Sequence, residues 1–164
     1  MKTPMNVFNT TMKKKNKNRK GFSLVELIVC LVIMAILAAA LVPTLIGYIK
    51  QTRQSNAKNE AAACVSAAQT VVSSAFADPD NYYQNQSTGT RFQITDVTNA
   101  DETTIDNADF IAAIASLSEM QAADISNVKV KDGVVVGLTY DAGNDSKDIV
   151  DYTVASGKGT YAMR

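Results

Sequence analysis

The fold is decided by residues 20–49, which read KGFSLVELIVCLVIMAILAAALVPTLIGYI. After Glu26, the 23 residues from Leu27 to Ile49 carry no formal charge. At a helical rise of about 1.5 Å per residue, this stretch is long enough to cross the hydrocarbon core of a bilayer, which is about 30 Å thick. The sequence therefore predicts a membrane-spanning helix near the N-terminus.

The segment before this helix is strongly basic. Residues 1–21 contain seven lysines and arginines and no acidic residue, which leaves nine basic and sixteen acidic residues in the rest of the chain, a formal charge of −7. A basic end inside the cell and an acidic body outside agree with the positive-inside rule. The cluster KKKNKNRK at residues 13–20 could instead bind nucleic acid, but beside a membrane helix it is better explained as an orientation signal.

Glu26 is an unusual residue at the start of a membrane helix. Charged side chains within such helices cost about 2.5 to 3.5 kcal/mol on insertion scales, so a carboxylate here needs a partner. We expect none within its own helix, because the next basic residue downstream is Lys50. A cation from outside the helix would explain its position.

The basic leader, Gly21, Phe22 and Glu26 together resemble the class III signal of type IV pilins and pseudopilins. The resemblance implies that a prepilin peptidase removes residues 1–21 by cutting between Gly21 and Phe22, and that Phe22 is then N-methylated. It also implies that Glu26 pairs with the N-terminal amine of a neighbouring subunit during assembly, where a low dielectric strengthens the pair. The apolar helix stays on the mature protein.

Two other kinds of export signal fit less well. A secretory signal peptide could end at the small residues Ala38, Ala39 and Ala40, but the apolar run continues well beyond them. A lipoprotein signal could use Cys30, but Val29 is large for the preceding position and Glu26 interrupts the apolar region. These departures from the two signals favour a helix that is retained as a membrane anchor.

The helix is expected to continue beyond the membrane. Apolar residues recur every three or four positions from Ala57 to Phe76, which indicates a helix with one buried face, and Asp78-Pro79 ends it. We therefore predict one helix with two halves: residues 22–49 in the membrane or the filament core, and residues 50–77 packed on a globular head. Small residues such as Ala57, Ala61 and Ala68 would let a sheet approach closely.

Pro43 interrupts the hydrogen-bonding pattern of this predicted helix. A proline inside a helix removes one backbone hydrogen bond and favours a kink or a locally melted turn. In pilins the matching proline marks a stretch that can unwind in the fibre, so the resemblance suggests extensibility. The alternative is an ordinary proline at the outer membrane interface.

Residues 78–164 are predicted to form the head of an α+β, pilin-like fold. We expect a polar loop from Asp80 to Ile105, in which only Phe92, Ile94 and Val97 show strand-like alternation, and then a short helix opened by residues 106–109. A small antiparallel meander follows, with a hairpin turn at Asp132-Gly133. The strands are expected at residues 127–131, 134–140, 149–154 and 160–163.

The sequence offers little chemistry for catalysis. It contains no histidine, and its two cysteines, Cys30 and Cys64, would lie about 50 Å apart on one helix, too far to form a disulfide. We expect no enzyme activity, no cofactor and no metal. A weak calcium candidate consists of oxygen donors at Asp141, Asn144, Asp145, Asp148 and Asp151, although a solvated acidic turn explains these residues better. Tyr82 and Tyr83 could belong to an adhesive surface, but more often such a pair covers a small core.

The sequence thus predicts the structural subunit of a type IV pilus, for adhesion or motility. The expected partners are identical subunits, prepilin peptidase, the assembly platform protein and its ATPase, with no nucleic acid unless the system is of the competence type. The expected location is the cytoplasmic membrane for the single-pass precursor and the cell surface for the pilus. Two alternatives are a pseudopilin of a type II secretion or DNA-uptake system and a membrane-anchored extracytoplasmic binding domain.

Overall fold

The computed structural model describes residues 21–143 and 148–164, and it has a long N-terminal helix followed by small antiparallel sheets. The described residues fall into two units, divided after Pro43. Helix α1 spans Leu24–Ala77. The predicted α+β, pilin-like layout is therefore confirmed, whereas the division of the chain into functional segments at residues 21, 49 and 77 stays a prediction.

The predicted loop from Asp80 to Ile105 is wrong in part, because this region contains regular structure. Strands β1 (Tyr82–Gln84) and β2 (Arg91–Gln93) form a two-stranded sheet, followed by the 3-10 helix η1 (Thr95–Thr98) and strand β3 (Thr103–Thr104). Tyr83 and Phe92 face each other in this hairpin, with ring centroids 5.5 Å apart, and both are buried. Burial of these two rings stabilises short strands that the polar composition hides.

The main sheet is an antiparallel meander, as predicted. Its strand order is β3-β4-β5-β6-β7, with β4 at Ile125–Lys131, β5 at Val134–Asp141, β6 at Ile149–Ala155 and β7 at Lys158–Met163. Helix α2 (Ala108–Ser118) and the 3-10 helix η2 (Ala122–Asp124) lie between β3 and β4 in the chain. The side chain of Asn107 caps α2 by accepting hydrogen bonds from the backbone N–H groups of Asp109 and Phe110.

Two irregularities between β4 and β5 keep the apolar side chains on one face. Asn127, at φ 50°, is an extra residue on β4, and Val136 is an extra residue on β5 a few positions further along the pairing. A single extra residue would turn all later side chains to the other face of the sheet. Because the two extra residues offset one another, Val128, Val135 and Leu138 all point into the same core.

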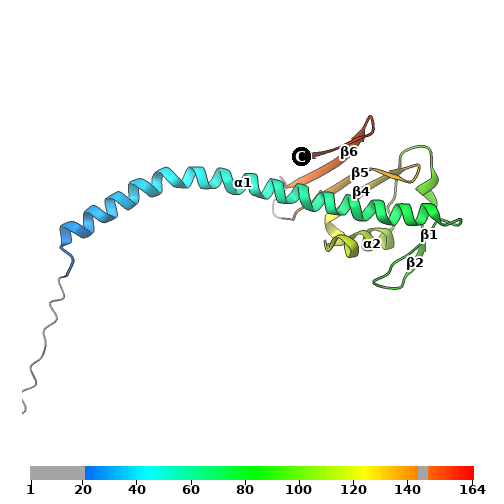
Figure 1. Cartoon of the computed structure of the whole chain (residues 1–164), viewed down its shortest axis with the longest axis horizontal. Helices are drawn as coiled ribbons and strands as arrows, with labels where there is room; N and C mark the ends of the chain where they lie inside the picture. Colours follow the sequence, from blue (N-terminus) through cyan, green and yellow to red (C-terminus); the bar gives the residue numbers. More distant parts are fainter. Residues whose placement is uncertain (1–20, 144–147) are drawn as a thin grey trace, which may run out of the picture. The chain divides into compact units, whose positions relative to one another are not determined.

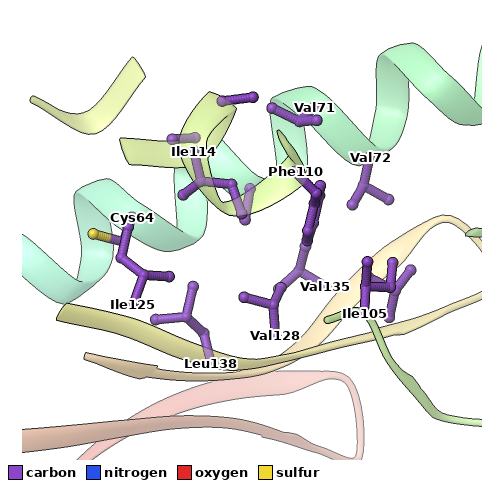
Figure 2. Packing of buried hydrophobic residues seen from close by; sticks show 14 of the residues in the cluster. Cys64, Val71, Val72, Ile105, Phe110, Ile114, Ile125, Val128, Val135 and Leu138 are labelled. Carbon is purple, nitrogen blue, oxygen red and sulfur yellow. The ribbon is translucent and has the colours of Figure 1, made fainter. Parts of the chain in front are cut away.

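The core of the head lies between α1, α2 and this face of the sheet. Figure 2 shows Phe110 and Ile114 of α2 between Val71 and Val72 of α1 and the strands below them. Small residues line the buried face of α1 as expected, and these are Ala57, Ala61, Cys64, Ala67, Ala68 and Ala75. Cys64 is a buried free thiol on this face of α1. Within this head, Figure 1 shows α1 lying along the sheet.

Polar contacts fix α1 to the sheet. The Gln69 side chain donates to the carbonyl of Gly133 (3.0 Å) and accepts from the backbone N–H of Val135 (2.8 Å), so it holds the β4–β5 turn. Gly133 itself lies close to α1. A Cβ atom added at this position, where φ is 72°, would lie 2.8 Å from the Phe76 ring. Burial, with Glu60 as hydrogen-bond acceptor 3.1 Å from the phenol, raises the pKa of Tyr140 well above its ordinary value.

Removing the Phe110 side chain is expected to destabilise the head strongly. Phe110 is fully buried at the centre of the core, so Phe110→Ala should lower the free energy of unfolding by about 3 to 5 kcal/mol. Leu117→Ala is a matched control on the same helix, because Leu117 is 44% exposed and its loss should change stability by less than about 0.5 kcal/mol. Urea unfolding of the full chain in detergent, followed by tyrosine fluorescence, measures both. Equal effects of the two substitutions would contradict this description of the core.

Candidate processing and assembly site

The residues of the predicted cleavage site lie just before α1. Gly21, Phe22 and Ser23 are exposed and belong to no helix or strand, and the helix begins at Leu24. The Phe22 side chain is 82% exposed, and within residues 21–143 and 148–164 no atom beyond the chain neighbours of Gly21 lies within 4 Å of the position that a Cβ on Gly21 would take. The Gly21–Phe22 peptide bond thus lies in an exposed segment, and packing against the described part of the chain does not explain the glycine.

Glu26 accepts a hydrogen bond from the residue just before its helix. The backbone N–H of Ser23 donates a hydrogen bond to Oε2 of Glu26, at 3.3 Å. Ser23 is the residue before the helix and Glu26 is its third helical residue, so the contact is one half of a capping box. The first N–H groups of a helix lack acceptors within it and carry partial positive charge, which favours a carboxylate at this place.

Sequence reasoning missed Ser23, although a signal was present. The pattern Ser23-Leu24-Val25-Glu26 has the serine and glutamate spacing of a capping box. Because Ser23 contributes its backbone N–H, the contact does not depend on its hydroxyl. A single N–H also leaves the carboxylate able to accept further hydrogen bonds, including one from an outside cation.

The helix surface after Glu26 is apolar on every side. All residues from Leu27 to Ile49 are exposed in the isolated chain, including Leu31, Ile36 and Ile46. In the described part of the chain, α1 is the one helix that is long and apolar enough to cross a membrane, and none of its most apolar window is buried. Cys30 lies exposed on this surface as a free thiol. A surface of this kind needs lipid or another protein around it.

Pro43 lies inside α1, and the helix continues through it. The isolated chain therefore has no melted turn at this residue. Unwinding at Pro43 in a fibre stays a prediction.

The weak calcium candidate lies partly outside the described residues, because Asn144 and Asp145 fall in residues 144–147. Of the described members, Asp141 accepts a hydrogen bond from the backbone N–H of Gly143. Asp151 accepts from the Thr139 hydroxyl and forms an ion pair with Arg164 at 2.9 Å, on the outer face of the sheet. Residues 21–143 and 148–164 contain no group of three or more acidic, histidine or cysteine side chains placed to hold a metal ion.

Tyr82 and Tyr83 have different surroundings. Tyr83 is buried against Phe92, so it covers part of the core as the sequence suggested. The Tyr82 ring is half-buried under the Arg91 guanidinium, which lies 4.1 Å from the ring centroid. Because this cation covers the ring, the pair of tyrosines does not form one open aromatic surface.

Comparison with known protein families matches residues 16–42 to the prokaryotic N-terminal methylation motif. Comparisons with curated proteins and with solved structures found no match for the chain. The motif includes the predicted cleavage site, Glu26 and most of the apolar run, and it implies a structural protein that is processed by prepilin peptidase and handled by pilus assembly machinery. The apolar helix and the motif together fit membrane anchoring before pilus assembly. Residues 16–42 are thus the class III signal peptide of type IV pilins, and the motif supports placing this chain among the precursors of the type IV pilin and pseudopilin family.

Proposed function

We propose that this chain is the structural subunit of a type IV pilus filament that serves adhesion or motility. In this proposal prepilin peptidase cuts between Gly21 and Phe22, Phe22 is N-methylated, and the assembly platform and its ATPase move the subunit from the membrane into the fibre. The observation that carries the proposal is the methylation motif. It overlaps the charge-free part of α1, whose apolar side chains are exposed in the described chain.

The assembly step follows from the chemistry of that helix. Outside the bilayer its apolar surface is unfavourable in water, and contact with the same helices of other copies would cover it. Each contact joins different surfaces of two copies, so it does not close and can extend into a fibre. Glu26 would neutralise the Phe22 amine of a neighbour and so favour one axial register.

The mature N-terminus provides the direct test of processing. We expect mass spectrometry of the protein from sheared surface fibres to find a chain that begins with N-methylated Phe22. A chain that still carries residues 1–21, or one that begins after Ala40, would contradict the proposal and leave a simple anchor or a secretory signal.

A pseudopilin of a secretion or DNA-uptake system is the second candidate, because the matched motif is common to both groups. A pilin and a pseudopilin differ in whether the subunit forms long filaments on the cell surface. Long surface filaments built mainly of this chain would support the pilus, whereas processed protein that never leaves the cell envelope as filaments would support the pseudopilus.

A further inference from the structure

An open groove runs beside α1 on the head. One wall is the flank of α1 with Val65, Ser66, Gln69, Thr70 and Ser73, and the other wall is formed by β5, β6 and β7. Its volume is about 610 Å³. The α1 residues that line it run from Ala62 to Ser74, about 18 Å or three turns of helix. The groove is thus long enough to take several turns of another helix.

The strand wall carries a pair of aromatic rings. Tyr152 and Tyr161 are directly paired across β6 and β7, and their ring centroids are 4.9 Å apart. The Tyr152 ring lies over Gly159, where a Cβ would meet it at 2.6 Å, so the glycine allows the ring to lie flat along the strand. Both rings are half-buried, which leaves aromatic surface available in the groove.

The groove carries no charge. None of its lining residues is charged, and α1 has no charged residue from Ala61 to Ala77. A charged segment placed there would lose its hydration without gaining a counter-charge, which is unfavourable. The occupant is therefore expected to be an uncharged, largely apolar segment.

The chain itself contains a segment of this kind. Residues 27–49 form the longest charge-free run of the sequence, and every one of them is exposed. Small groove residues such as Ala62 and Ser66 allow a second helix to approach closely, and the tyrosine rings can pack on leucine and isoleucine side chains.

We propose that the groove of one copy binds the apolar helix of a second copy in the filament. This inference rests on the proposed function, and it adds a specific receiving surface on the head. The contact forms only when the helix has left the bilayer, so it belongs to the assembled state. It joins two different surfaces, so it can repeat along a fibre.

Photo-crosslinking in assembled filaments tests this contact. Tyr161→p-benzoylphenylalanine places a photoreactive ring of similar shape in the groove, and the same replacement of Tyr82, whose ring lies outside the groove, is the control. After irradiation, we expect mass spectrometry to join the position-161 peptide to a peptide from residues 22–49 of a second copy, and the control to lack this product. Crosslinks from position 161 only to head residues 78–164, or none between subunits, would overturn the inference.

A charge placed in the groove provides a second measurement. Ser74→Glu adds a carboxylate at an exposed groove residue, and we expect about tenfold less filament. Ser126→Glu adds the same charge at an exposed position outside the groove and should assemble normally. Normal assembly of Ser74→Glu would overturn the inference while leaving the filament proposal intact, whereas absence of fibres from the unaltered protein would contradict both.

Discussion

Glu26→Val is expected to abolish filaments while leaving cleavage intact. The substitution removes the carboxylate but keeps the apolar helix, Gly21 and Phe22, so membrane insertion and recognition by the peptidase should continue. A mature subunit without this carboxylate leaves the neighbour's N-terminal amine without a counter-charge in an apolar core, which is strongly unfavourable. We expect filament yield, counted by electron microscopy, to fall about tenfold or more.

The hydrogen bond from Ser23 makes a sharper control possible. Glu26→Gln keeps an oxygen that can accept from the Ser23 backbone N–H but removes the charge. If the charge is what assembly needs, Gln should fail as Val does. Abundant filaments from Glu26→Gln would show that the hydrogen bond with Ser23 is enough for assembly. Abundant filaments from Glu26→Val would show that assembly needs neither the charge nor this hydrogen bond.

Gly21→Leu is expected to block processing. The glycine has open space around it, so leucine should leave the fold of the rest of the chain unchanged. A bulky side chain beside the bond to be cut should prevent that bond from entering the peptidase. We expect almost all of the protein to remain as a full-length precursor in the membrane, visible as a slower band on an immunoblot.

The matched control for this prediction is Gly47→Leu. Gly47 also has open space around it, but it lies inside α1, far along the sequence from the cleavage site. This substitution should leave processing unchanged. Normal cleavage of Gly21→Leu, or equal loss of cleavage in both variants, would contradict the role assigned to Gly21.

The long helix could be predicted because its signals are local. The charge-free run, the three- and four-residue spacing from Ala57 and the Asp78-Pro79 stop depend only on neighbouring residues. The Asp132-Gly133 hairpin could be predicted for the same reason, because both residues adopt the left-handed backbone that this turn needs. The cleavage motif is likewise a short pattern within one segment.

Other features depend on residues that are distant in the sequence. Strands β1 and β2 are stabilised by the contact of Tyr83 with Phe92 in a core, and the sequence shows only the weak alternation at Phe92, with no sign of the pairing. Gln69 resembles any polar residue of a helix surface, yet it holds the β4–β5 turn through two hydrogen bonds.

For this protein, the sequence by itself determined the long apolar helix, the methylation motif and the order of helix and meander, because each rests on periodicity, charge or a contiguous motif. Only the tertiary structure decided the β1–β2 hairpin, the offsetting irregularities of β4 and β5, and the groove with Tyr152 and Tyr161 on its wall. The reason is physical: burial and close packing depend on which distant side chains meet, and local patterns do not specify those meetings.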